Sequence, residues 1–149
     1  MKDIKKILFP VDLSEPIKKV IPYAQLMASR FDADIHLLYV VRGLELFTSP
    51  YFPLSQNMDF EEITSLAQTQ IYDFRDQHFK DFQKTRANVL IGHPAEEILN
   101  YIMSERIELV IMGTHGRKGL NKAIFGSVAE RVVKTATVPV MVVNTFQEK

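Results

Sequence analysis

The stretch that decides the fold is "IELVIMGTHGRKGLNKAIFGS", residues 107–127. It begins with a short apolar run, which predicts a strand, and it ends at Ser127, where apolar residues start to recur at helical spacing. Between the two, four of the six glycines of the chain fall from Gly113 to Gly126. Glycine lets the backbone turn in ways that other residues resist, and it lets the backbone approach a ligand closely.

The rest of the chain repeats this alternation of strand and helix. Apolar runs predict strands, and segments with apolar residues three and four positions apart predict helices between them. The predicted strands cover residues 4–12, 33–41, 86–92, 107–113 and 138–143, and the predicted helices cover 17–31, 59–82, 94–102 and 127–136. This order favours parallel pairing with right-handed crossovers. We therefore predict one α/β domain, residues 1–149, with three α/β/α layers around an open parallel five-stranded sheet.

Composition narrows the classes of function. The chain has 149 residues, and its 18 basic side chains balance 18 acidic ones, so net charge provides no attraction to nucleic acid or anionic membrane. It has no cysteine, which excludes disulfides and thiolate metal sites. No segment reaches the roughly 20 apolar residues of a membrane span, and the first residues do not form the apolar stretch of a signal peptide. We expect a cytoplasmic protein with no nucleic-acid or membrane partner.

The glycine cluster predicts a phosphate site. In open α/β sheets, ligands bind beyond the carboxyl ends of the strands, where the strand order reverses. Gly113 and Gly116 lie at such an end, and Gly126 with Ser127 opens a helix whose free N–H groups and dipole favour an anion. Arg117 and Lys118 lie between these two sites and add positive charge. The alternative is that the glycines serve only tight turns and that Ser127 forms a capping box with Glu130.

The spacing within the cluster matches a known signature. Gly113 and Gly116, then nine residues, then Gly126-Ser127 form a G-2x-G-9x-G-[S/T] pattern, which resembles the nucleotide-binding signature of the universal stress protein family. The segments "ILFPVDLSE" (7–15), "GHPAEEIL" (92–99) and "GSVAERVVKTATVPVMVV" (126–143) are also similar to that family, so the resemblance covers essentially the whole chain. It implies the strand order 3-2-1-4-5.

The resemblance also implies a binding site for ATP, which AMP or ADP could occupy as well. It places adenine and ribose beside Asp12, beside Val40 or Val41, and along Met112 and Gly113. It places the phosphates beside Gly116, Arg117, Gly126, Ser127 and Val128. Pro10 and Val11 then face the glycine loop together with Asp12, and His115 and Lys118 lie in the same loop.

Several roles stay open at this point. Asp12 could hold a magnesium ion that bridges phosphates, or it could cap the turn after the first strand. No catalytic residue can be assigned, so we expect a nucleotide-binding regulatory protein of the stress response with at most slow ATP hydrolysis. The alternatives are a nucleotide hydrolase or nucleotidyl transferase that uses Asp12, His115 and Lys118, and an interaction module with an empty cleft.

Two segments suggest partners. Residues 42–58 contain prolines and a glycine and show no periodicity, which predicts a long loop that acts as a lid or contacts a protein partner. The last strand, 138–143, is apolar throughout, and in the implied order it lies at a sheet edge, where exposed apolar strands invite pairing. The resemblance implies a homodimer through this strand. Burial under a neighbouring element of the same chain is the alternative.

Overall fold

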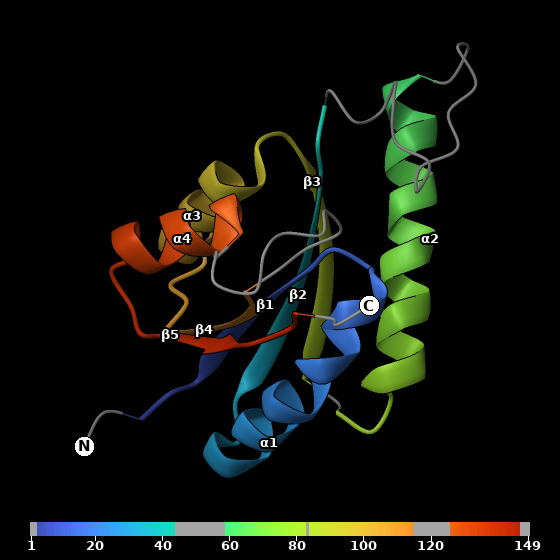
Figure 1. The fold of residues 1–149 in the computed structure, drawn as a ribbon. Coiled ribbons are helices and arrows are strands. Elements are labelled where there is room, and N and C mark those ends of the chain that lie inside the picture. Colours follow the sequence, from blue (N-terminus) through green and yellow to red (C-terminus); the bar gives the residue numbers. More distant parts are fainter. Residues whose placement is uncertain (1–2, 44–58, 83, 115–125, 147–149) are drawn as a thin grey trace.

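The computed structural model describes residues 3–43, 59–82, 84–114 and 126–146 (Figure 1). Its centre is a five-stranded sheet in the order β3-β2-β1-β4-β5 in which every pairing is parallel. This confirms the predicted fold class and strand order. The elements are β1 Lys6–Val11, the 3-10 helix η1 Glu15–Lys19, α1 Ile21–Phe31, β2 Asp34–Val41, α2 Phe60–His78, β3 Thr85–Ile91, α3 Pro94–Ser104, β4 Leu109–Gly113, α4 Ser127–Thr135 and β5 Val140–Val143.

The sheet divides the apolar core into two layers. Successive side chains of β1 point to opposite faces, so Ile7 and Phe9 pack with α1 and α2, whereas Leu8 packs with α3 and α4. Figure 1 shows α1 and α2 together on one side of the sheet and α3 and α4 on the other. Both layers are needed because the central strands are fully buried, with Ile7, Leu8 and Phe9 each 0% exposed.

The first helical segment differs from the prediction of one helix over residues 17–31. The structure has η1 first, and α1 begins only at Ile21. Pro22 explains the break, because proline lacks an N–H and its ring clashes with a carbonyl one turn earlier if an α-helix runs into it. Proline is tolerated in the first turn, and α1 restarts there.

The second helix starts as the sequence indicates. Asp59 is the N-cap of α2, and its side chain accepts a hydrogen bond of 2.9 Å from the Glu62 N–H. The helix ends at His78, earlier than predicted, and Phe82 packs against the core from the turn that follows. Among the helices in the described part of the chain, none combines the length and the apolarity that crossing a bilayer requires.

Candidate functional site

The neighbouring strands β1 and β4 pair over only part of their length. The register of β1 with β4 covers Ile7–Leu109 and Leu8–Val110, so β1 continues past this pairing to Val11. Pro10 lies in that extension and has no N–H with which to continue a ladder. The neighbouring strand β2 stays paired with β1 as far as Tyr39, and Val40 and Val41 extend beyond it. The strand order reverses between β1 and β4, so this edge of the sheet is the switch point at which such folds bind ligands.

Asp12 follows β1 at this edge and organises the turn. Its Oδ1 accepts hydrogen bonds from the Ser14 N–H at 3.1 Å and from the Ser14 hydroxyl at 2.6 Å. Between them, Leu13 has φ 60°, a left-handed conformation that costs a non-glycine residue about 1–2 kcal/mol. The capping role that the sequence offered for Asp12 is therefore present. The described residues contain no group of three His, Asp or Glu side chains able to hold a metal ion.

Gly113 ends β4 beside this turn, and its lack of a side chain has a packing reason. A Cβ at Gly113 would lie 2.7 Å from Cγ2 of Thr145 and 3.4 Å from Cγ2 of Val20. Thr145 is 1% exposed and fills the space that a side chain at position 113 would need. None of the described glycines has a positive φ. At Gly113, glycine is therefore needed for close approach by another side chain of the same chain.

Thr114 joins three segments at the end of β4. Its N–H donates to the Val143 carbonyl of β5 at 2.9 Å, and its hydroxyl accepts from the Thr145 N–H at 3.2 Å. Its carbonyl accepts from the Gly126 N–H at 2.7 Å. These bonds hold the start of α4 against the end of β4. Gly126 is thus held next to the end of β4, whereas Gly116, which the phosphate hypothesis also requires, lies outside the described residues.

The capping box of Ser127 with Glu130, which was the alternative to a phosphate site, is not formed. Gly126 is the N-cap, and it has no side chain with which to cap the helix. Ser127 is exposed, and the Glu130 carboxylate accepts from Lys134 Nζ at 2.7 Å, one turn further along the helix. The Gly126 N–H is bonded to Thr114, and the first intrahelical bond runs from the Glu130 N–H to the Gly126 carbonyl, so the N–H groups of Ser127, Val128 and Ala129 have no acceptor within the helix.

The predicted adenine contacts are mainly core residues. Val41 is 4% exposed and packs in the layer of α1 and α2, and Met112 is 5% exposed and packs under α3 and α4. Val40 is half-buried against the same layer as Met112. A ligand at this edge would meet the backbone of these residues more than their side chains. His115, Gly116, Arg117 and Lys118 lie outside the described residues, as does the predicted loop from residue 44 onwards.

Sequence reasoning missed Thr114 and Thr145. Both are buried polar residues, at 6% and 1% exposure, and together they tie β4, β5 and α4 to one another. The available signal was weak. Thr114 follows an apolar strand, and nothing in its neighbourhood indicates that its hydroxyl accepts from a residue 31 positions later.

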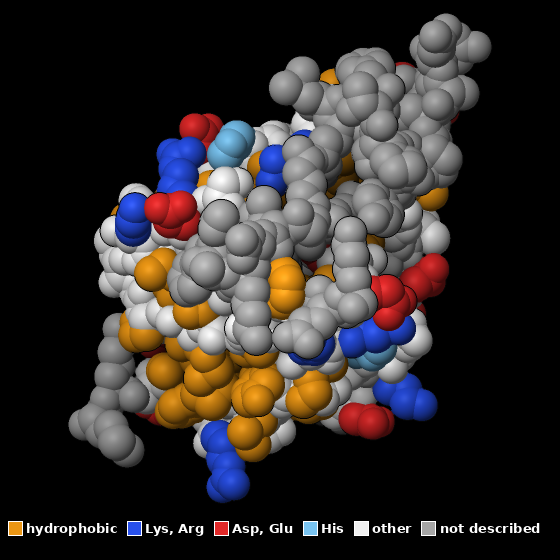
Figure 2. Space-filling view, viewed as in Figure 1, with side chains coloured by type: hydrophobic (Ala, Val, Ile, Leu, Met, Phe, Trp, Pro, Cys, Tyr) orange, Lys and Arg blue, Asp and Glu red, His pale blue; other side chains and the backbone are white. Residues whose placement is uncertain are grey.

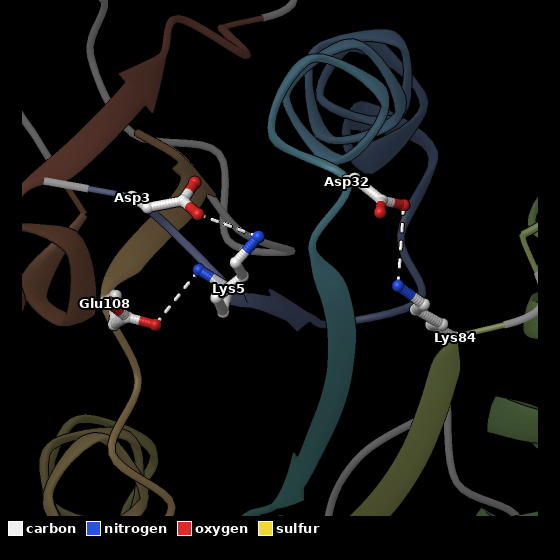
Figure 3. A network of polar contacts seen from close by, with 5 residues as sticks. All are labelled: Asp3, Lys5, Asp32, Lys84 and Glu108. Carbon is white, nitrogen blue, oxygen red and sulfur yellow. Dashed lines mark hydrogen bonds and ion pairs between the residues drawn. The ribbon is translucent and has the colours of Figure 1, made fainter.

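The opposite end of the sheet carries exposed ion pairs. Before β1, the Lys5 N–H donates to the Glu108 carboxylate at 3.0 Å, and Lys5 Nζ lies 2.8 Å from Asp3 (Figure 3). Lys84, just before β3, reaches Asp32, just before β2, at 3.5 Å. These charges connect the amino ends of four strands, away from the switch point. Exposed pairs of this kind contribute little to stability.

A buried polar cluster lies within the core under α3. His36 of β2 is 1% exposed, and its Nδ1 lies 2.7 Å from the Tyr101 hydroxyl of α3, which also accepts from Asn88 Nδ2 at 2.9 Å. His36 Nε2 is buried and has no hydrogen-bond partner among the described residues. Burial lowers the pKa of His36 and raises the pKa of Tyr101 to about 12. His36 pairs with Leu8 and Arg86 in mid-sheet, so it is not part of the switch-point site.

This cluster predicts a loss of stability in acid. Burial is the main cause of the lowered pKa of His36, and the positive charges of Arg86 and Lys6 act in the same direction. His36 stays neutral in the folded protein, whereas in the unfolded chain it gains a proton near the usual histidine pKa of 6.5. Its contribution is therefore complete above that pH and is lost as the pH falls towards the folded pKa. Glu105 and Asp34 oppose the shift.

We expect urea unfolding of the wild type to show a larger decrease in the free energy of unfolding from pH 7 to pH 5 than unfolding of His36→Gln does. His78→Gln is made for comparison, because burial also lowers the pKa of His78, which lies at the end of α2 and outside the buried cluster. The double variant should show the flattest profile. Equal slopes for the wild type and His36→Gln would contradict the assignment.

Comparison with known proteins supports the same family as the sequence. Residues 3–144 match the universal stress protein family. The chain is 34% identical over 144 residues to Universal stress protein MJ0531 of Methanocaldococcus jannaschii, which covers 94% of this chain and 82% of that protein. The fold of this chain is also similar to that of MJ0577 from the same organism, with a TM-score of 0.81 and 26% identity, and the alignment covers 99% of both chains.

A further solved structure is a universal stress protein from Archaeoglobus fulgidus in complex with dAMP. It has a TM-score of 0.66 and 17% identity, and the alignment covers 95% of this chain and 98% of that one. This likeness is one of fold, and the nucleotide belongs to that protein. The family match over residues 3–144 and the 34% identity with MJ0531 give the assignment: the chain belongs to the universal stress protein family.

Proposed function

We propose that this protein binds an adenine nucleotide, with ATP as the leading ligand and AMP or ADP as alternatives, and acts as a cytoplasmic regulatory protein in the stress response. The observation that carries the proposal is the start of α4, where the N-cap is a glycine and no side chain of a described residue caps the helix, and which is bonded through Gly126 to the end of β4. The dAMP complex of the Archaeoglobus fulgidus relative supports the adenine nucleotide class.

The physical case for phosphate rests on the first N–H groups of α4. The N–H groups of Ser127 and Val128 have no intrahelical acceptor, and the helix dipole places partial positive charge at this end. An anion here would accept hydrogen bonds from N–H groups at the helix start, the acceptor role that the side chains of a capping box would otherwise have. Arg117 and Lys118, which the sequence places in the preceding loop, would add charge.

The adenosine would lie towards β1 and β2. Val40 and Val41 extend beyond the end of β1, and Met112 and Gly113 end β4 on the other side of Pro10 and Val11. Asp12 is held in place by Ser14 and has a second carboxylate oxygen, which would accept from a ribose hydroxyl or bind magnesium together with phosphate oxygens.

The test is to identify what the protein holds and what stabilises it. We expect mass analysis of small molecules released on denaturation of freshly purified protein to find an adenine nucleotide. We also expect the melting temperature to rise progressively with added ATP, because a ligand that binds only the folded state stabilises it. GTP is the matched control for the base. No released nucleotide and no shift with ATP, ADP or AMP at millimolar concentration would favour a nucleotide-free interaction module.

Hydrolysis separates the two remaining functions. A regulatory protein needs binding without rapid chemistry, whereas a nucleotide hydrolase or transferase needs turnover. An ATP turnover above about 1 s⁻¹, the low end of typical enzyme rates, would replace the regulatory proposal with the enzymatic one.

We also propose that the protein forms a homodimer through β5. All four residues of this edge strand are half-buried hydrophobics, and Tyr23 and Leu26 of the nearby α1 are each 49% exposed. Figure 2 shows hydrophobic side chains gathered on the face around β5 and α1. A second copy paired along β5 would cover this surface and the unpaired backbone groups of the strand.

Light scattering coupled to size exclusion should therefore give about twice the 17.1 kDa mass of the chain. We expect Val142→Pro, which removes one N–H from the edge strand, to shift the mass towards the monomer, since an edge strand pairs through its backbone. Val133→Ala on α4 is the control, because that side chain is exposed and lies off the strand. A wild-type mass equal to the single chain across micromolar to millimolar concentration would contradict the dimer.

A further inference from the structure

Thr114 has more than a strand-end role. Its three polar groups bond to three segments: β5 at Val143, the chain after β5 at Thr145, and the start of α4 at Gly126. It is 6% exposed, and the Thr145 that it bonds is 1% exposed. A buried donor that loses its acceptor is costly, so these bonds fix the relative positions of the three segments.

The hydroxyl of Thr114 controls this junction through Thr145. Without it, the Thr145 N–H would have to find another acceptor, and the chain after β5 would shift. Thr145 packs so closely over Gly113 that a Cβ there would lie 2.7 Å from its methyl group, so a shift of Thr145 is felt at the end of β4. The Thr114 carbonyl, which holds Gly126, moves with that end.

We propose that Thr114 is a positioning residue of the nucleotide site: its hydroxyl sets where the first N–H groups of α4 stand, and so it selects for the phosphates and not for the nucleoside. This rests on the proposed function. The donors concerned, on Ser127 and Val128, follow Gly126 directly in the chain, whereas most of the proposed adenosine contacts lie on β1 and β2 and only Met112 and Gly113 lie on β4. A change at Thr114 should therefore weaken the binding of ATP much more than the binding of adenosine.

The test compares dissociation constants for ATP and adenosine by calorimetry in three variants. Thr114→Val keeps the shape and both backbone bonds but removes the hydroxyl, Thr114→Ser keeps the hydroxyl, and Ile71→Val removes a methyl group from the opposite core layer. We expect Thr114→Val to weaken ATP about tenfold, as for a charge-assisted hydrogen bond that is partly lost, and adenosine less than about twofold. Thr114→Ser and Ile71→Val should keep the wild-type ratio of the two constants.

Other outcomes overturn the inference. A dissociation constant for ATP in Thr114→Val equal to that of the wild type would do so. A proportional loss of affinity for ATP and for adenosine would also do so, because a purely structural role gives that result. If Thr114→Val does not fold, Gly126→Pro removes the N–H that donates to Thr114, and its φ of −58° suits proline. Unchanged ATP affinity in that variant would also overturn the inference. A wild type that binds neither ligand refutes the proposed function itself, a result distinct from a wild type that binds and a variant that is unaffected.

Discussion

Replacement of Ser127 with proline is expected to weaken ATP binding about ten- to a hundredfold, the loss of one hydrogen bond to a charged group, while adenosine binding stays nearly constant. Ser127 is the first residue of α4, where proline is favoured, because its missing N–H takes no part in the helix. Gly126 before it has φ −58° and ψ 148°, the extended conformation that a residue preceding proline adopts. The substitution therefore deletes one donor and leaves the helix intact.

Ser127→Ala is the matched control for this experiment. It keeps the N–H and removes the hydroxyl, which caps no helix in this structure. Titration calorimetry with ATP, AMP and adenosine would measure the effect, and circular dichroism would verify that helix content is unchanged. If Ser127→Pro and Ser127→Ala bind ATP equally well, the N–H of residue 127 does not contact phosphate.

Substitution of Gly113 by alanine is expected to destabilise the fold by about 1–3 kcal/mol, as is usual when extra atoms are forced into a packed site. The new Cβ would approach Thr145 Cγ2 to 2.7 Å, and Thr145 is buried and bonded to Thr114, so it cannot swing away freely. Urea unfolding monitored by circular dichroism measures the effect as a change in the midpoint.

The double variant Gly113→Ala/Thr145→Ala tests the cause of that loss. It removes the methyl group and the hydroxyl that the new Cβ would meet, at 2.7 and 3.1 Å. We expect the double variant to be less destabilised than the sum of the two single variants, because the clash is absent from it. Additive single effects would show that Gly113 is needed for another reason, such as its backbone conformation.

The sheet was predictable because its central strands β1, β2 and β4 are buried on both faces. The runs around Ile7 and Leu109 are apolar without interruption, and such a run indicates a buried strand whichever helices cover it. The order of the strands was a different matter, since local pattern does not specify which strand lies beside which. That part came from the resemblance of several segments to one family, and the pairing of β1 with β4 agrees with it.

Helix ends were less predictable because several local solutions compete. Ser127 and Glu130 have the spacing of a capping box, yet Glu130 bonds to Lys134 instead, an equally common pairing one turn away. Asp59 has a similar pattern and does cap α2. Glu130 has Lys134 four residues later, whereas Glu62 has no basic residue at that spacing, so only the start of α4 offers a competing partner.

At the candidate site, the positions were easier to predict than their reasons. Gly126 is bonded to Thr114, next to Gly113, whereas the convergence of main-chain N–H groups on a phosphate stays a prediction. The need for glycine at Gly113 comes from Thr145, a residue 32 positions away that packs into the space of the absent side chain. A contact between segments so distant in the chain has no periodic signature, so local reasoning could not have found it.

The place of β1 in the sheet also has a consequence for how the chain folds. β2 follows it closely, but its other neighbour, β4, is synthesised roughly one hundred residues after β1, which takes several seconds at ribosomal rates. Pairings so distant in sequence are slow to form, because a long loop has to close first. A nascent chain that stops short of Leu109 would therefore carry its central, fully buried strand with one side open, a form prone to aggregate until the second half emerges.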